Sequence, residues 1–158
     1  MKNILVTRID DRLIHGQVMT AWVKSYPINH ILIVDDELSK NQFMLSVYKS
    51  AMPAGIEVSI TDRANGVALL KQDPLPGENY LILVKVPEVV AYLLDNGIPL
   101  TKLLVGGMGA KPGRKTLIRN VSANDEERAC LKALEGRGVH TVYQLVPADK
   151  EIPLAGSL

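Results

Sequence analysis

The chain lacks several features that mark common protein classes. Its 158 residues include one cysteine, Cys130, so no internal disulfide can form, and we expect a reducing compartment with this residue as a small apolar side chain. Lysine and arginine total 18 against 17 aspartate and glutamate, and this balance argues against a nucleic-acid binder. No apolar run approaches the roughly 18 residues of a membrane span. Charged residues at 8–12 interrupt any secretory signal, so we expect a soluble cytoplasmic protein without export.

What remains is the composition of an ordinary globular domain, with 47% hydrophobic and 22% charged residues. Strand-like and helix-like stretches alternate without a repeat or a linker, which predicts one α/β domain over residues 1–158, with a loose tail from about 148. We expect an open, mostly parallel twisted sheet with helices on both faces, because several strands are apolar on both sides. The expected strands are residues 3–7, 31–34, 57–60, 80–84, 103–105 and 139–146, with a short strand at 116–118 where an antiparallel edge could enter.

Two polar residues are predicted to begin helices. Ser39 opens a capping-box pattern ahead of Phe43, Val47 and Ala51, which share one helix face. Ser122 is expected to cap the last helix.

The most informative segment is residues 8–17, RIDDRLIHGQ, which places a histidine between a strand and a helix. Upstream, residues 3–7 form an apolar, β-branched run typical of a buried strand. Downstream, one helix face is apolar: Val18, Met19, Trp22, Val23 and Tyr26. A phosphoryl group on His15 would therefore meet the free N–H groups at the start of a helix.

Phosphoryl transfer through histidine needs a nucleophilic imidazole nitrogen, a hydrogen bond that fixes the other nitrogen, and positive groups around the phosphoryl oxygens. His15 is the candidate nucleophile. Arg12 and Arg8 could both donate forked hydrogen bonds to a phosphoryl group, which lysine cannot do. The ordinary alternative is a surface histidine among weak, exposed salt bridges.

The remaining residues of the segment have supporting roles in this hypothesis. Asp10 and Asp11 repel phosphate, so we expect them to hold the arginines or the imidazole. Gly16 and Gln17 offer backbone N–H groups for phosphate binding, and the missing side chain at Gly16 leaves room for an incoming phosphohistidine.

These motifs closely resemble the IIB component of the mannose/fructose/sorbose class of bacterial sugar phosphotransferase systems. The resemblance runs from residue 1 to about 147, and rests on RIDDRLIHGQV at 8–18, VDD at 34–36 and VGGM at 105–108, followed by GRK at 113–115. It implies that His15 takes a phosphoryl group from the histidine of a IIA partner. The group then passes to a sugar bound by membrane IIC and IID subunits.

The resemblance therefore implies a protein-N-phosphohistidine–sugar phosphotransferase that needs no metal, nucleotide or other cofactor. It places the chain in the cytoplasm, at the inner face of the membrane through IIC and IID. The sugar stays open among mannose, fructose, sorbose, N-acetylgalactosamine and related amino sugars or conjugates. The phosphorylated nitrogen and a homo-oligomeric state stay open too.

Two other stretches are expected to follow strands at the same edge of the sheet as residues 8–17, and both invite binding hypotheses at this rim. Asp35 and Asp36 could belong to a metal site, but a pair of carboxylates more often caps a turn. The glycines of residues 106–115 superficially resemble a phosphate loop, but the spacing is wrong. Basic side chains lie in this loop and just after it, and they form either a docking patch or a solvated surface: Lys111, Arg114, Lys115 and Arg119.

The segment also suggests how a partner would dock. Leu13 and Ile14 are apolar beside the candidate nucleophile, which indicates either a protein contact or packing beneath the loop. His30 and His140 lie in apolar strands, where a structural role is expected. The competing functional hypotheses are a non-covalent nucleotide- or small-ligand-binding α/β module, and a scaffold for the membrane complex.

Overall fold

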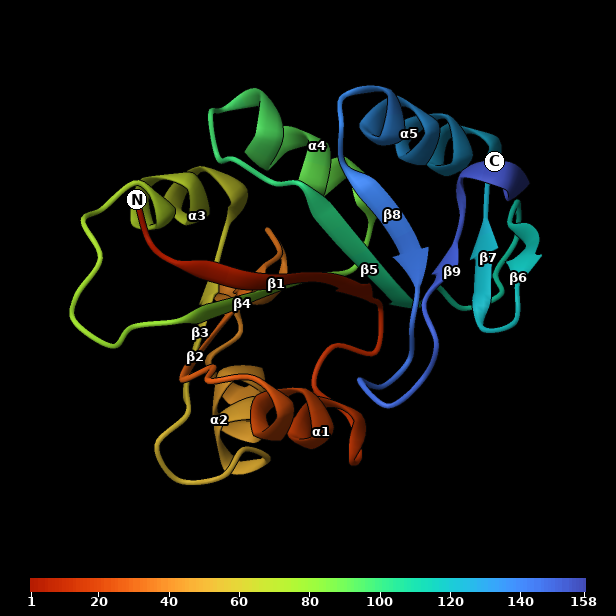
Figure 1. Cartoon of the computed structure of the whole chain (residues 1–158). Helices are drawn as coiled ribbons and strands as arrows, with labels where there is room; N and C mark the ends of the chain where they lie inside the picture. Colours follow the sequence, from red (N-terminus) through yellow and green to blue (C-terminus); the bar gives the residue numbers. More distant parts are fainter.

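The computed structural model describes residues 1–158 and shows an open, twisted sheet between two layers of helices (Figure 1). Its strand order is β3-β2-β4-β1-β5-β8-β9, and only β9 is antiparallel. The strands are β1 (Ile4–Asp10), β2 (His30–Val34), β3 (Glu57–Thr61), β4 (Tyr80–Val84), β5 (Lys102–Gly107), β8 (His140–Tyr143) and β9 (Ile152–Pro153). A separate antiparallel pair consists of β6 (Lys115–Ile118) and β7 (Val121–Ala123).

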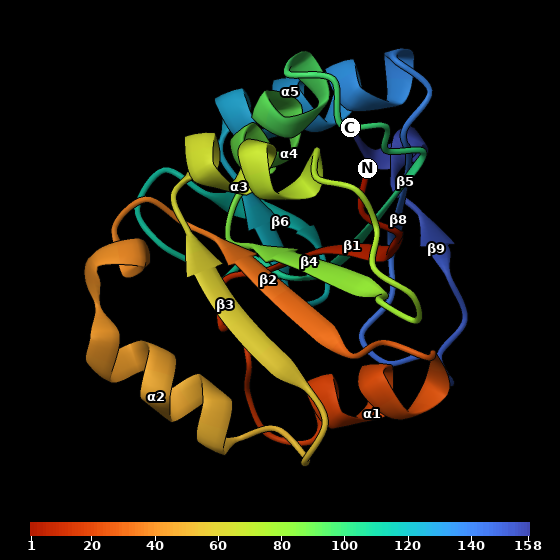
Figure 2. The same ribbon diagram turned by 90° about the vertical axis from the view of Figure 1, so that its left-hand side faces the viewer.

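Helices cover both faces of the sheet, as Figure 2 shows. The helices are α1 (Val18–Ser25), α2 (Gln42–Ser50), α3 (Arg63–Leu70), α4 (Pro87–Asp95) and α5 (Asp125–Gly136), with short 3-10 turns at Leu38–Lys40 and Ala155–Ser157. Side chains of β4 alternate between two apolar cores, with Ile82 packed toward α3, α4 and α5 and Leu81 toward α1 and α2. All five residues of β4 are buried. The expected fold class is confirmed.

The antiparallel edge strand exists, but the C-terminal segment supplies it. Ile152 and Pro153 pair with β8, and Leu154 behind them is fully buried. The expectation of a loose tail from about residue 148 is therefore wrong for this segment, which closes one edge of the sheet. Residues 116–118 do form a strand, but it pairs with β7 outside the main sheet.

Two caps differ from those predicted. Asn41, not Ser39, begins α2, and its side chain accepts a hydrogen bond from the N–H three residues on, at 3.0 Å. The face shared by Phe43 and Val47 points to solvent, since these side chains are 75% and 41% exposed. The helix packs instead through the face that holds Tyr48.

The last helix is capped two residues later than predicted, at Asn124 and not at Ser122. Ser122 lies inside β7, and Asn124 caps α5 by accepting from the N–H of Glu127 at 2.7 Å. The carboxylate of Glu127 returns the bond to the N–H of Asn124 at 2.9 Å. This reciprocal pair forms a capping box, which places Glu127 where it meets the loop after β5.

Candidate functional site

The candidate site lies at the C-terminal end of β1, in the centre of the sheet. This strand runs to Asp10, three residues further than predicted, between β4 and β5. The loops after β1, β2 and β5 leave the same edge of the parallel sheet, where open α/β sheets bind ligands. The segment from Arg8 to His15 therefore reaches the ligand-binding edge with the loop after β5 beside it.

Asp10 is the centre of this site, and its carboxylate is fully buried. One oxygen accepts from the backbone N–H and Nε of Arg12, at 3.1 and 3.0 Å. The other accepts from Nη2 of Arg12 at 3.1 Å and meets Nε2 of His15 at 3.0 Å. Burial pushes the pKa of Asp10 upward, but hydrogen bonds from Arg12 and His15 outweigh burial and leave the pKa below its ordinary value. The charged carboxylate of Asp10 therefore holds three groups in place: the backbone N–H of Arg12, the guanidinium of Arg12 and the imidazole of His15.

The imidazole of His15 is held by one nitrogen only. Nε2 faces the carboxylate of Asp10, while Nδ1 has no partner in the chain, and the side chain is 23% exposed. A carboxylate acceptor favours the tautomer with the proton on Nε2, because the neutral ring has one donor and one acceptor nitrogen. The unprotonated nitrogen is then Nδ1. Two residues connect His15 to α1: Gly16, which has φ +48°, and Gln17, which is the N-cap of the helix.

Arg8 does not reach the surface, contrary to the expectation that it would bind a phosphoryl group. Its side chain is fully buried, its two terminal nitrogens donate to the carbonyls of Gln144 and Leu145 at 2.7 and 2.8 Å, and it lies over the ring of Trp22. Burial lowers the pKa of Arg8 to about 10. A Cβ at Gly106 would lie 1.9 Å from Nη2, so only glycine leaves room for this guanidinium.

Arg12 is the arginine that remains accessible. Its side chain is 45% exposed, and the hydrogen bonds to Asp10 raise its pKa. Nε and Nη2 face Asp10, and Nη1 has no partner in the chain. Gly107 lies directly beneath, where a Cβ would approach Nη2 to 2.8 Å. The structure thus leaves Arg12 with a free donor at the surface of the site.

Arg114 is also buried, so it cannot serve as the exposed docking charge that the sequence suggested. Its side chain is 1% exposed and donates to both carboxylate oxygens of Glu127, at 2.9 and 2.7 Å. The third nitrogen donates to Asp11 at 3.3 Å and to the carbonyl of Gly109 at 2.9 Å. Arg114 therefore ties the loop after β5 to the loop after β1. Sequence reasoning missed Glu127, although its capping-box position was a usable signal.

Comparison with known proteins identifies the family. The family model described as "PTS system sorbose subfamily IIB component" matches residues 4–158. The chain belongs to this family.

Several relatives of this IIB component carry sugar-specific names. It is 35% identical over 146 residues to the "PTS system sorbose-specific EIIB component" of Lacticaseibacillus casei, covering 92% of this chain and 89% of that one. It is 29% identical over 149 residues to the "PTS system mannose-specific EIIAB component" of Escherichia coli strain K12, with 94% of this chain covered. The match spans about half, 46%, of that longer relative. The crystal structure of the IIBSor domain of the Klebsiella pneumoniae sorbose permease superposes with a TM-score of 0.91 at 28% identity, covering 98% and 95% of the two chains.

Leu13 and Ile14 of the IIB component are buried, at 1% and 7% exposure, so the structure shows the second of the two alternatives, packing beneath the loop, and not an apolar docking surface. Both pack in the core beneath the loop with Trp22. Leu13 has φ +57°, a left-handed conformation that turns its side chain inward. The two residues therefore anchor the active loop from below.

In the acidic pair after β2, Asp35 caps the following turn and Asp36 binds the first residue of α3. Asp35 accepts from the N–H of Leu38 at 2.9 Å, and Asp36 holds the backbone N–H and Nε of Arg63 at 2.9 and 3.1 Å. No group of three His, Cys, Asp or Glu side chains in the chain is arranged as a metal site. Lys111, the remaining rim candidate, is exposed.

Proposed function

We propose that this IIB component is a phosphocarrier whose Nδ1 atom of His15 holds the phosphoryl group. The observation that carries the proposal is the 3.0 Å contact between Nε2 and the buried carboxylate of Asp10. This contact keeps a proton on Nε2, leaves Nδ1 as the nucleophile, and balances the positive charge that the ring gains on phosphorylation.

The proposed reaction has two transfers through one nitrogen. Nδ1 attacks the phosphorus of a IIA phosphohistidine, forming one P–N bond while the donor P–N bond breaks and its electron pair returns to the donor imidazole. A sugar hydroxyl oxygen then attacks the same phosphorus, the electron pair returns to Nδ1 of His15, and the hydroxyl proton passes to water. Nε2 keeps its proton throughout. Arg12 supports both steps, because its free Nη1 can meet the phosphoryl oxygens.

The proposed partners are a IIA protein, membrane IIC and IID subunits, and the imported sugar. The mannose-specific relative from Escherichia coli is named as an EIIAB component, which supports a IIA partner. The sugars named for the relatives are sorbose, mannose, fructose and N-acetylgalactosamine, which supports a hexose or an N-acetylated hexosamine as the acceptor. None of the helices combines the length and the apolar run needed to cross a membrane. We propose that the chain works in the cytoplasm and reaches the inner face of the membrane through IIC and IID.

Incubation with a phosphorylated IIA protein tests the carrier function. We expect one covalent, acid-labile and base-stable phosphoryl group, and nitrogen-phosphorus coupling in NMR spectra should place it on Nδ1 of His15. His15→Gln should take up none. Uptake by the variant would overturn the choice of His15, and attachment at Nε2 would overturn the role given to Asp10.

The same incubation separates the carrier from the alternatives. Reversible nucleotide or ligand binding without an adduct would support a non-covalent binding module. Partner binding that survives His15→Gln, again without an adduct in the parent protein, would support a scaffold.

A further inference from the structure

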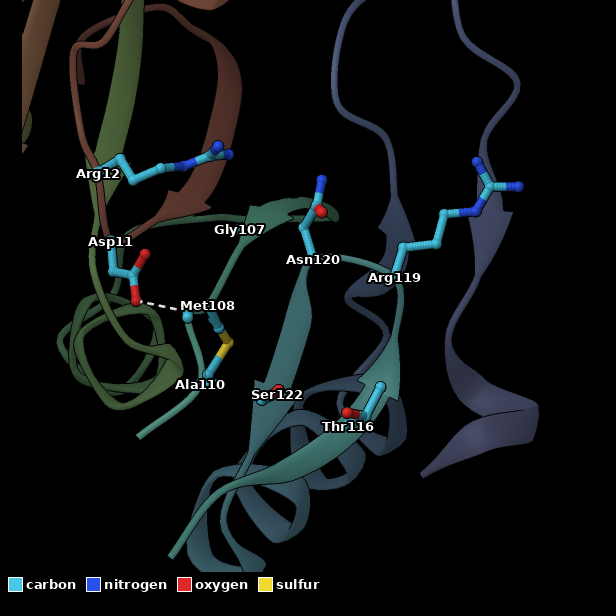
Figure 3. A pocket seen from close by; sticks show the side chains of 10 residues that line it. Asp11, Arg12, Gly107, Met108, Ala110, Thr116, Arg119, Asn120 and Ser122 are labelled. Carbon is cyan, nitrogen blue, oxygen red and sulfur yellow. Dashed lines mark hydrogen bonds between the residues drawn. The ribbon is translucent and has the colours of Figure 1, made fainter. Parts of the chain in front are cut away.

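A polar cavity of about 380 Å³ opens beside Arg12, between the loop after β5 and the β6–β7 hairpin (Figure 3). Its size lies within the range of about 300–1,000 Å³ that is typical of small-molecule sites. Only two of its ten lining residues are apolar, and the set is Asp11, Arg12, Gly107, Met108, Gly109, Ala110, Thr116, Arg119, Asn120 and Ser122. Nothing in the carrier reaction through His15 uses most of these groups.

The hairpin side of the cavity presents hydrogen-bonding groups without partners in the chain. The guanidinium of Arg119 makes no hydrogen bond or ion pair, and the hydroxyls of Thr116 and Ser122 make none. The side-chain Nδ2 of Asn120 donates to the hydroxyl of Tyr143 at 3.1 Å, and the side-chain oxygen Oδ1 has no partner in the chain. These groups together offer donors and acceptors at several points of one concave surface, which suits a ligand with several hydroxyl groups.

The hairpin holds Arg119 in a left-handed backbone conformation, with φ +35°, that residues other than glycine and asparagine rarely adopt. Such strain persists where surrounding structure imposes it and is common at ligand-binding positions. Here the tight turn between β6 and β7 places Arg119 at the rim of the cavity, with its side chain extended away from Arg12 (Figure 3) and without a carboxylate partner in the chain.

The cavity is continuous with the phosphoryl-transfer site through Arg12. Its guanidinium lies against Asp10 on one side and lines the cavity on the other. In Figure 3, Arg12 and Asn120 extend from opposite sides of the cavity, with Gly107 between them. A molecule in the cavity would therefore lie next to the arginine that meets the phosphoryl oxygens.

We propose that this cavity binds the acceptor hexose during the second transfer and the hexose phosphate that the transfer produces. The proposal rests on the carrier function above and adds that this chain itself contributes to sugar recognition. Protein docking sites have apolar, aromatic centres, whereas this surface is concave and polar, which favours a small hydroxylated ligand over the IIA protein. The lining contains two arginines, Arg12 and Arg119, and one carboxylate, Asp11, which already binds Arg114 and the N–H of Gly109. The charge excess favours the phosphorylated sugar over the free sugar.

Titration of the isolated chain tests the cavity directly. The probes are an aldohexose 6-phosphate, a ketohexose 1-phosphate, the free hexoses and inorganic phosphate, followed through the amide NMR signals of residues 107–122. We expect at least one sugar phosphate to bind several-fold more tightly than inorganic phosphate. Equal affinities for sugar phosphate and inorganic phosphate would reduce the cavity to an anion-binding surface and overturn the proposal.

Two variants of Arg119 sharpen the titration. Arg119→Ala should weaken sugar-phosphate binding about tenfold, a loss equivalent to about 1.4 kcal/mol. Arg119→Gly should do the same while relieving the left-handed backbone, so a weakened affinity cannot be ascribed to unfolding. Arg137→Ala is the matched control, since Arg137 is a partly exposed arginine at the far end of α5. Unchanged affinity in both Arg119 variants would overturn the assignment of this residue.

The two half-reactions distinguish failure of the cavity from failure of the carrier function. Arg119→Gly should slow delivery to sugar, measured with membrane vesicles that contain IIC and IID, more than it slows uptake from phosphorylated IIA. If the parent chain takes up no phosphoryl group, the carrier function fails. If the parent is phosphorylated on His15 and Arg119→Gly delivers the group at the parental rate, the cavity proposal alone fails.

Discussion

Two histidines of this chain lie beside carboxylates at opposite ends of the sheet, and the difference between them is the reason why we propose only His15 as a nucleophile. His30 begins β2, where Nδ1 contacts Asn29 at 2.8 Å and Nε2 contacts Glu57 at 3.1 Å. Its ring also stacks on Tyr80 with centroids 4.7 Å apart. His15 has a partner on Nε2 alone. Both rings have charged neighbours, but only His15 keeps a nitrogen free for reaction.

The carboxylates differ as much as the rings. Asp10 is fully buried and binds two arginines as well as His15, whereas Glu57 is 76% exposed. A buried, fully hydrogen-bonded carboxylate holds its partners in one geometry, and an exposed one is screened by water. The comparison therefore predicts that substitutions at the C-terminal edge of the sheet, around Asp10, change stability and phosphoryl transfer strongly. Substitutions at the opposite edge, around Glu57, should change both only slightly.

Replacing each histidine by glutamine gives the largest expected contrast. His15→Gln should abolish phosphoryl uptake, because the nucleophilic nitrogen is lost, while His30→Gln should retain it. Labelled-phosphoryl uptake from a IIA donor measures both, and circular dichroism confirms that each variant is folded. Loss of uptake in a folded His30→Gln would contradict the assignment.

Asp10→Asn should be the most destabilising single change at the site. It keeps the side-chain shape but leaves Arg8 buried without a full counter-charge, and breaking such a pair costs about 3–5 kcal/mol. Urea unfolding measures this loss. A variant as stable as the parent would show that the carbonyls of Gln144 and Leu145 suffice to hold Arg8.

The same carboxylate predicts how stability depends on pH. The pKa of Asp10 is lower in the folded chain than its ordinary 3.8, so its contribution is complete above that value and is lost as pH falls through the folded-state pKa. The free energy of unfolding of the parent should therefore decline more steeply below about pH 4 than that of Asp10→Asn. Denaturant titrations at several acidic pH values provide the measurement, and parallel declines would disprove the prediction.

Arg12→Lys should slow transfer with little effect on folding. Lysine keeps the charge but loses the fork that binds Asp10 and a phosphoryl oxygen together, so we expect a loss of roughly tenfold, about 1.4 kcal/mol of barrier. Rapid-mixing transfer rates and thermal melting measure the two effects. A parental rate combined with easier unfolding would make Arg12 a structural residue.

Glu57→Gln is the smallest change and tests the other edge of the sheet. Its exposed contact with His30 should contribute less than about 1 kcal/mol. The free energy of unfolding should therefore stay near the parental value, and so should phosphoryl uptake. A loss comparable to that in Asp10→Asn would remove the distinction between the two edges.

The features that could be predicted from the sequence depend on neighbours along the chain. Strand β4 is buried on both sides, so its apolar run was sufficient to place it in the middle of a parallel sheet. The strand–loop–helix order around His15 was predicted on the same local grounds, and the family was identified from the same motif. The phosphoryl-transfer role of His15 stays a prediction.

Long-range contacts explain what could not be predicted. Arg8 and Arg12 look alike in the sequence, and only packing against Gly106 and the 144–145 carbonyls makes Arg8 internal. Arg114 is internal because Glu127, thirteen residues on, returns to meet it. Phe43 is exposed although it lies on the apolar helix face that the sequence predicts. Helical periodicity identifies which residues share a face, but it does not show whether another layer covers that face.

The bond from Arg8 to the carbonyl of Gln144 spans 136 positions of the chain, and the bond to Leu145 spans 137. Trp22 donates to the same Leu145 carbonyl at 3.0 Å. During synthesis, which adds about 5–20 residues per second, the first strand emerges many seconds before these acceptors exist. A segment synthesised 136 positions after Arg8 therefore completes the surroundings of the loop after β1. A nascent chain that stops short of residue 144 has no way to assemble this arginine's final environment.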